Sequence, residues 1–132
     1  MVAEEKKIRI LLTKSQVDGH DRGVRYVARR LREAGMEVIY TRYKSSDDII
    51  NSALQEDVDV IGISYSVGGY DVISAEVIKM KKEKGMDNTI VIIGGIIPED
   101  ETPGLLDMGI SGVFGPGSFA DDIVEHIRTS VN

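Results

Sequence analysis

The sequence predicts an α/β fold built on a five-stranded parallel sheet, and two observations support this prediction. Short apolar runs of strand length recur along the 132 residues, and each is followed by a stretch whose apolar residues have helical spacing. Such strict alternation favours a parallel sheet with right-handed crossovers and helices on both faces. The length and a hydrophobic content of 42% indicate one globular domain over residues 1–132.

The predicted strands are short and rich in apolar residues: 8–13, 37–43, 58–64, 89–93 and 112–114. The predicted helices follow them in turn: 24–31, the segment after 45–46, 72–84, 98–108 and 123–131. The third strand is almost continuously apolar, as expected of a strand covered on both faces. In the second helix we expect a buried face of Ile50, Ala53 and Leu54. In the fourth, we expect Pro103 and Gly104 to weaken or break the helix.

Five strand–helix units at this length fit the flavodoxin-like (Rossmann-like) doubly wound sheet with strand order 2-1-3-4-5. In that order the winding reverses between the first and third strands, and ligands bind there at the carboxyl ends of the strands. The loops that leave these two strands read KSQVDGHDRG, residues 14–23, and SYSVGGY, residues 64–70. We therefore expect His20 and Ser64 to border the same crevice.

Composition argues against several classes of partner. The net charge is −6, with acids and bases interspersed, which is not typical of a protein that binds nucleic acid or a membrane surface. No apolar run approaches the roughly 20 residues that span a bilayer, and the N-terminus lacks the apolar core of a signal peptide. With no cysteine there is no disulfide and no thiolate metal site. We expect a cytoplasmic protein.

The familiar sites of flavodoxin-like proteins do not fit this crevice. A phosphorylated receiver domain needs an acidic pair at the first strand and an aspartate after the third, but here Lys6 and Lys7 precede the first strand and the third ends in Ser64. A flavin phosphate loop is rich in Ser, Thr and Gly, whereas here residues 16–18 after Ser15 read QVD. Neither a P-loop nor G-x-G-x-x-G follows the first strand.

His20 remains as a candidate base or metal ligand. Asp18 is close enough in sequence to accept a hydrogen bond from its Nδ1, which would leave the Nε2 lone pair facing outward, and Lys14 could hold Asp18 in turn. A lone imidazole makes a poor zinc site but suits a metal held in a macrocycle that needs one axial ligand. A hydrogen-bonded surface histidine is the alternative interpretation. We interpret His126, near the end of the last helix, in that structural way.

Residues 18–23, DGHDRG, resemble the D-x-H-x-x-G signature of cobalamin-binding domains. Ser64 and the Gly94-Gly95 pair are similar to the later S-x-L and G-G elements of that family. Together with GGIIP at 94–98 and FGPG at 114–117, the chain from 8 to about 127 resembles the corresponding domain of methylmalonyl-CoA mutase and the small subunits of related acyl-CoA mutases. Two positions depart from the pattern: Ser66 replaces the S-x-L leucine, and Tyr70 replaces a histidine.

The resemblance implies that His20 is the axial ligand of cobalt, in place of the cofactor's own benzimidazole. Asp18 would be its hydrogen-bond partner and Lys14 the support of that aspartate. The nucleotide tail would enter a channel beside the sheet, where Ser66 removes an apolar wall. The residues implied to bind the cofactor are Lys14, Asp18, Gly19, His20, Asp21, Arg22, Gly23, Ser64, Ser66, Gly94, Gly95 and Gly115.

By the same resemblance the chain would be the cobalamin-binding small subunit of an adenosylcobalamin-dependent acyl-CoA mutase, with methylmalonyl-CoA mutase favoured. It would hold the cofactor base-off and His-on and present it to a separate substrate-binding large subunit for a radical 1,2-rearrangement, without activity of its own. The alternatives are a corrinoid carrier of a methyltransferase or a cobalamin sensor, which usually carry a preceding helical bundle. A third alternative is an interaction domain that has lost cobalamin, and Ser66 is the only sequence feature that supports it.

Overall fold

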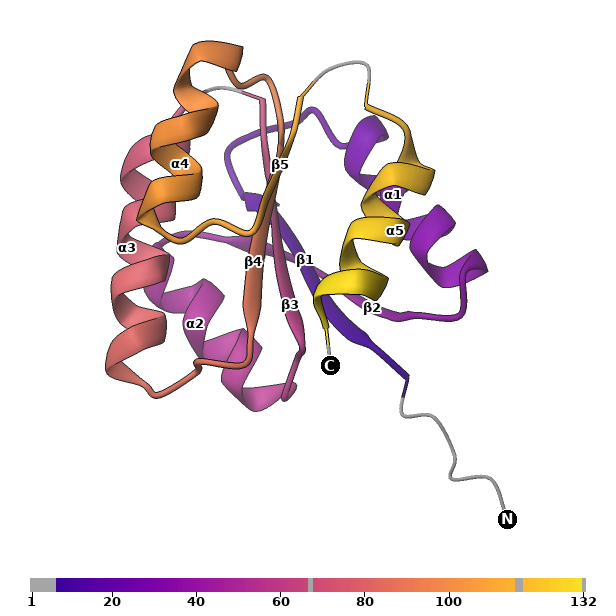
Figure 1. Ribbon diagram of the computed structural model, residues 1–132, viewed down its shortest axis with the longest axis horizontal. Coiled ribbons are helices and arrows are strands. Elements are labelled where there is room, and N and C mark those ends of the chain that lie inside the picture. The colour runs from indigo at the N-terminus through magenta and orange to yellow at the C-terminus, as the bar shows by residue number, and fades with distance from the viewer. Residues whose placement is uncertain (1–6, 67, 116–117, 132) are drawn as a thin grey trace.

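A five-stranded parallel sheet forms the centre of the molecule (Figure 1). The computed structural model describes residues 7–66, 68–115 and 118–131, so positions 116–117 of the FGPG motif lie outside the described residues. The strand order is β2-β1-β3-β4-β5, and every neighbouring pair is parallel. The predicted flavodoxin-like arrangement is therefore confirmed.

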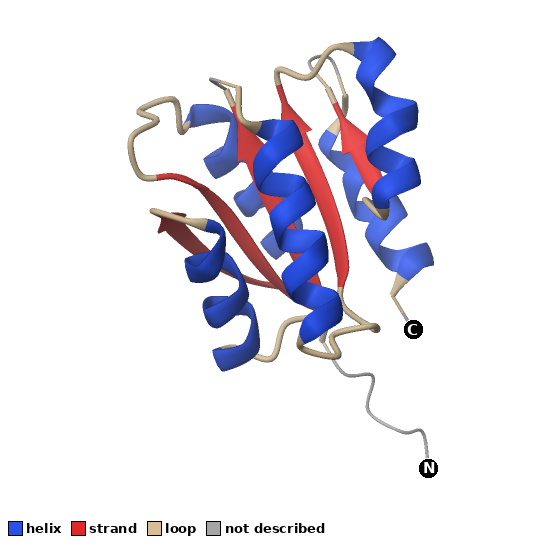
Figure 2. Cartoon of the chain, turned by 90° about the vertical axis from the view of Figure 1, so that its left-hand side faces the viewer, coloured by secondary structure: helices blue, strands red, loops and turns tan. Residues whose placement is uncertain are grey.

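The strands alternate with helices along the whole sequence. The strands are β1 (Arg9–Ser15), β2 (Glu37–Tyr43), β3 (Val60–Tyr65), β4 (Ile90–Gly95) and β5 (Gly112–Phe114). The helices are α1 (Arg22–Glu33), α2 (Ser46–Gln55), α3 (Tyr70–Glu83), the short 3-10 helix η1 (Glu99–Glu101), α4 (Thr102–Met108) and α5 (Ala120–Ser130). Helices α1 and α5 cover one face of the sheet, and α2, α3 and α4 cover the other (Figures 1 and 2). In the described part of the chain, none of these helices has the length and apolar content to cross a membrane.

The buried face of α2 differs from the prediction by one residue. Ile49, Ile50 and Ala53 are buried, whereas Leu54 is 44% exposed. Leu54 lies at the edge of the apolar strip, because each step along a helix turns the next side chain by about 100°. The expectation that Leu54 is part of the core was therefore wrong.

The predicted fourth helix is divided into two segments. Residues 99–101 form the η1 turn, and α4 begins at Thr102 with Pro103 in its first turn. Proline is tolerated there because the first N–H groups of a helix have no partner within the helix. Pro103 therefore lies in the first turn of α4 rather than ending a longer helix. The last helix ends at Ser130, so Val131 lies just beyond it.

Strand β1 is the central element that positions the loop after it. It pairs with β2 on one side and β3 on the other, so that Lys14 is in register with Arg42 and Ser64. Its residues from Ile10 to Lys14 are buried, as expected of a strand covered by helices on both faces. The loops after β1 and β3 consequently leave the sheet side by side, as the winding order predicts.

Gly95 allows the end of β4 to lie against the end of β3. Its φ of +112° belongs to the region that favours glycine, and a Cβ there would overlap the backbone carbonyl of Tyr65. The same carbonyl oxygen accepts a hydrogen bond from the N–H of Ile96 at 2.8 Å. A side chain at position 95 would therefore push two neighbouring strand ends apart.

We expect Gly95→Ala to lower the free energy of unfolding of the cofactor-free protein by about 3 kcal/mol, since left-handed strain and overpacking each cost about 1–3 kcal/mol. Urea unfolding measures this change. Gly104→Ala is the control, because a Cβ at this position in α4 meets no atom within 4 Å. It should be neutral or stabilise by up to about 1 kcal/mol. Equal stability of Gly95→Ala and the parent would contradict the close approach.

Candidate functional site

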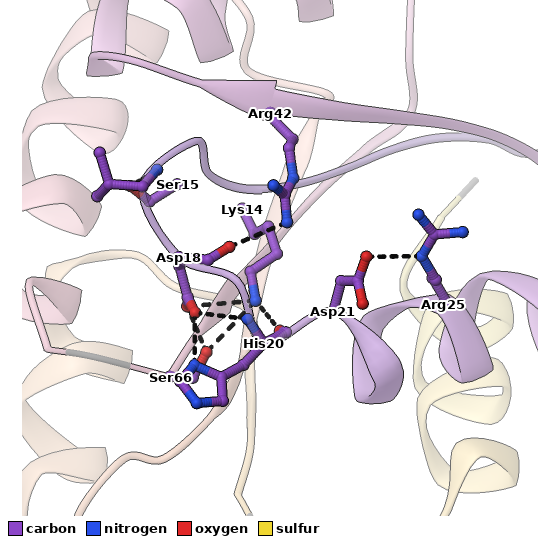
Figure 3. Close-up of polar contacts among 9 residues, drawn as sticks. Lys14, Ser15, Asp18, His20, Asp21, Arg25, Arg42 and Ser66 are labelled. Carbon is purple, nitrogen blue, oxygen red and sulfur yellow. Dashed lines mark hydrogen bonds and ion pairs between the residues drawn. The ribbon is translucent and has the colours of Figure 1, made fainter.

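The loop between β1 and α1 holds an imidazole against a buried carboxylate. Oδ1 of Asp18 accepts hydrogen bonds from the backbone N–H of His20 and from its Nδ1, both at 2.9 Å (Figure 3). The N–H of Asp18 in turn donates to the carbonyl of Ser15 at 3.1 Å. The Asp18 side chain is 1% exposed, whereas that of His20 is 77% exposed. The loop therefore buries the carboxylate and presents the imidazole at the surface.

The other oxygen of Asp18 faces a buried lysine and a serine. Nζ of Lys14 lies 3.2 Å from Oδ2 of Asp18, and the Lys14 side chain has no exposed surface. Lys14 also donates to the carbonyl of His20, and the hydroxyl of Ser66 donates to Oδ2 (Figure 3). The predicted contacts of Lys14 with Asp18 and of Asp18 with His20 are present. The part played by Ser66 was missed, because the sequence motif treats this position only as a lost apolar wall.

Hydrogen bonding keeps Asp18 ionised. Burial alone would raise the pKa of this carboxyl, but hydrogen bonds from Ser66, His20 and Lys14 outweigh burial and hold the pKa well below its usual range. An ionised carboxylate can only accept hydrogen bonds, so the proton of the neutral imidazole belongs on Nδ1. The lone pair of the outer nitrogen, Nε2, is then available to a proton or a metal.

The end of β2 fixes the backbone of the same loop. Nη2 of Arg42 donates to the carbonyl of Asp18 at 2.9 Å, and the N–H of Gln16 donates to the carbonyl of Tyr43 at 2.9 Å. Sequence reasoning did not find Arg42. The available signal was its register with Lys14, which appears only after the strands are paired. The loop is thus held from both neighbouring strands.

The start of α1 carries an ion pair at the mouth of the site. Oδ2 of Asp21 accepts a hydrogen bond from Nε of Arg25 at 2.7 Å, and this bond lowers the pKa of Asp21. Asp21 occupies the N-cap position without a side-chain cap to the helix. Its carboxylate is therefore engaged along the helix surface rather than with His20.

A cavity of about 530 Å³ opens beside His20. Apolar side chains line much of it, from β1, α1, β4 and α5: Leu12, Val24, Val27, Ile92 and Ile123. Ten of the residues predicted to bind a cofactor also line it: Gly19, His20, Asp21, Arg22, Gly23, Ser64, Ser66, Gly94, Gly95 and Gly115. The other two, Lys14 and Asp18, are buried and contact His20 instead. The structure therefore brings the predicted residues together around one space.

The walls of the cavity include exposed backbone and a polar side chain. A Cβ at Gly23 would meet no atom within 4 Å, so α1 presents an open stretch of backbone there. Ser64 borders the cavity, and none of the side-chain hydrogen bonds among the described residues involves its hydroxyl. Among the described residues no group of three His, Cys, Asp or Glu side chains is placed to hold a metal. His20 would therefore serve a metal as a single ligand.

Comparison with known proteins gives the family context of this site. Residues 8–125 match the model of the B12 binding domain. The chain is 44% identical over 124 residues to the pivalyl-CoA mutase small subunit of Xanthobacter autotrophicus, covering 93% of this chain and 83% of that protein. It is 38% identical over 129 residues to the 2-hydroxyisobutanoyl-CoA mutase small subunit of Aquincola tertiaricarbonis, covering 97% and 95%. Human mitochondrial methylmalonyl-CoA mutase is 33% identical over 119 residues, 89% of this chain but 16% of that protein.

Solved structures share the fold at lower sequence identity. A cobalamin-binding protein from Desulfitobacterium hafniense superposes with a TM-score of 0.80 at 20% identity, over 96% of this chain and 60% of that one. The signal receiver domain of NarL from Mycobacterium tuberculosis superposes with a TM-score of 0.71 at 19% identity, over 95% and 96%. The architecture therefore accommodates more than one type of site.

We expect Asp18→Asn to destabilise the cofactor-free protein by about 3 kcal/mol at pH 7, because it leaves the Lys14 ammonium buried without its counter-ion. Urea unfolding as a function of pH measures the effect. The folded-state pKa of Asp18 is lowered, so its stabilisation is full above the unfolded pKa of about 3.9 and is lost as the pH falls below it. The difference between parent and variant should therefore shrink in acid.

Two further variants test the cause. Asp18→Asn combined with Lys14→Met removes both charges and should recover most of the loss. Asp107→Asn, at an exposed position of α4, should change stability by less than about 0.5 kcal/mol. If Asp18→Asn unfolds at the same urea concentration as the parent, the buried pair does not stabilise the fold.

Proposed function

The chain belongs to the B12-binding domain family, and on that premise we propose that it is the cobalamin-binding small subunit of an acyl-CoA mutase. Its nearly full-length likeness to two mutase small subunits supports this proposal. The single observation that carries it is the exposed imidazole of His20, whose Nδ1 is held at 2.9 Å by the buried Asp18 at the mouth of the cavity.

His20 would bind cobalt through Nε2. Its Nδ1 donates to Asp18, so the tautomer that exposes the Nε2 lone pair is the one already favoured in the cofactor-free protein. Lys14 compensates the charge of that carboxylate inside the fold. The donor set would fit a corrinoid, because the macrocycle itself would supply most of the ligands of the metal and one protein ligand would be enough.

The cavity would receive the nucleotide tail displaced from cobalt. Gly23, Gly94 and Gly95 border it with backbone rather than bulky side chains, and apolar residues line its depth. The hydroxyl of Ser64, which borders the cavity, would hydrogen-bond the benzimidazole. Gly19, Asp21, Arg22, Ser66 and Gly115 complete the border.

The bound cofactor in its adenosyl form would supply the radical that starts a 1,2-rearrangement of an acyl-CoA. This chain would ligate the cofactor, orient it and shield it from water, and we propose that residues 1–132 act as one cobalamin-binding domain.

The two small-subunit relatives are named for pivalyl-CoA and 2-hydroxyisobutanoyl-CoA mutases. Because their identity exceeds the 33% of methylmalonyl-CoA mutase, we favour an acyl-CoA of the pivalyl or 2-hydroxyisobutanoyl kind, whose α-carbon carries no hydrogen, over methylmalonyl-CoA.

The edge of the sheet around His20 carries exposed apolar side chains. Val17, Ile96 and Phe119 lie on the three loops that follow β1, β4 and β5, and they are 86%, 63% and 74% exposed. Large apolar side chains gathered at one edge are typical of an interaction surface. We propose that a substrate-binding large subunit covers this edge and the cofactor on it.

We expect His20 to donate the axial nitrogen, and electron paramagnetic resonance of bound cob(II)alamin tests this directly. In protein grown with 15N-labelled histidine, the cobalt superhyperfine pattern should change from a triplet to a doublet, because the coordinating nitrogen then comes from the protein. His20→Ala should remove the doublet. It should also weaken cobalamin binding at least about 10-fold, since mutation of a residue that only hydrogen-bonds a metal ligand already weakens metal binding by that much.

The second histidine of the chain provides the matched control. Nε2 of His126 lies 2.9 Å from the hydroxyl of Ser111, the residue before β5, so His126→Gln should retain the doublet. A triplet in the labelled parent protein would show that the cofactor keeps its own base. That result would exclude His20 as the ligand.

We expect rearrangement of an acyl-CoA only when a large subunit is added, because the two full-length relatives are named as small subunits of mutases. Phe119→Ser should weaken complex formation by about 10-fold while cobalamin affinity stays unchanged, as expected of an apolar contact at an interface. Leu106→Ser, on the exposed side of α4, is the control and should have no effect. Turnover by the small chain alone would contradict this division of labour, and methyl transfer by the loaded chain would favour a corrinoid carrier.

A further inference from the structure

Ser66 lies one residue beyond the end of β3 and faces the loop that carries His20 (Figure 3). Its hydroxyl donates to Oδ2 of Asp18, and its oxygen lies 3.4 Å from Nζ of Lys14. A lysine ammonium can only donate, so the serine oxygen accepts from Lys14 while its single proton is used on Asp18. Ser66 thereby closes a ring of contacts with both members of the buried ion pair.

The two oxygens of Asp18 have different tasks. Oδ1 binds the backbone and the ring of His20, whereas Oδ2 binds Ser66 and lies 3.2 Å from Lys14. A carboxylate is planar, so partners on both oxygens fix its rotation about the Cβ–Cγ bond. Lys14 alone would leave Oδ2 with an ammonium group, which is a point charge of little directional preference. The hydroxyl of Ser66 adds a directed bond from the neighbouring strand.

The orientation of His20 depends on that carboxylate. The imidazole is 77% exposed, and its ring is held in the described structure by Nδ1 on Asp18 at 2.9 Å. Little packing restrains the ring, so a rotation of the Asp18 carboxylate would move Nε2 directly. The position of Nε2 is consequently set through Asp18 by Ser66, the residue that follows β3.

We propose that Ser66 is a positioning residue for cobalt ligation: its bond to Oδ2 of Asp18 fixes the carboxylate that aims Nε2 of His20. This inference rests on the proposed function and adds to it a residue outside the histidine loop. It also gives the serine at this position a polar role, where the resemblance implied only the loss of an apolar wall.

The test uses the full chain with two measurements: the affinity for adenosylcobalamin, and the fraction of bound cob(II)alamin that shows the doublet from 15N-labelled histidine. Ser66→Ala should weaken binding about 10-fold and lower the His-ligated fraction at saturating cofactor. The second measurement is insensitive to a uniform loss of stability, because it counts only molecules that hold the cofactor. Ser66→Thr keeps the hydroxyl and should restore both values.

Ser52→Ala, at a similarly half-buried position of α2 on the opposite face of the sheet, is the control and should match the parent in both measurements. A parent doublet that is unchanged in Ser66→Ala would overturn the positioning role while leaving His20 as the ligand. A Ser66→Thr variant that behaves like Ser66→Ala would also overturn it, since the hydroxyl would then not be the cause. A labelled parent without the doublet would overturn the ligation itself, and the positioning role with it.

Discussion

The buried ion pair between Lys14 and Asp18 is the interaction on which the site depends. Both side chains are almost completely removed from solvent and their charged atoms are 3.2 Å apart. A buried charge is costly unless it is paired and hydrogen-bonded, and here each member of the pair has further partners. The fold thus holds an ionised carboxylate under an exposed imidazole. The Nδ1 of His20 is thereby held on Asp18, and its Nε2 is left for other partners.

The fold itself was predictable because it rests on local patterns. Alternating apolar runs and helical spacings identified the strands and helices, and the winding rule placed the loops after β1 and β3 at one edge. The two errors in the predicted helices each have a cause within the helix itself. Leu54 lies at the margin of an apolar strip, and Pro103 occupies the one part of a helix where proline is harmless. Neither position can be assigned without knowing where its helix begins.

The site was predictable only in part, for a different reason. Lys14, Asp18 and His20 are close in sequence, so their spacing suggested their contacts. Ser66 directly follows β3 and Arg42 lies in β2, and their contacts with Asp18 depend on strand register, which no short motif contains. The same limit applies to function. A receiver domain shares the architecture with a TM-score of 0.71, so the sheet alone does not select a cofactor.

The contacts of Asp18 also define what would have to be moved to build this site elsewhere. A designer who transplanted only DGHDRG onto another parallel sheet would bury a carboxylate with no counter-ion, and the loop would lose its anchors. The transferable unit is discontinuous: the end of β1 with Lys14, the loop, and the first residue after β3, Ser66. The histidine loop is therefore inseparable from the central pair of strands that supports it.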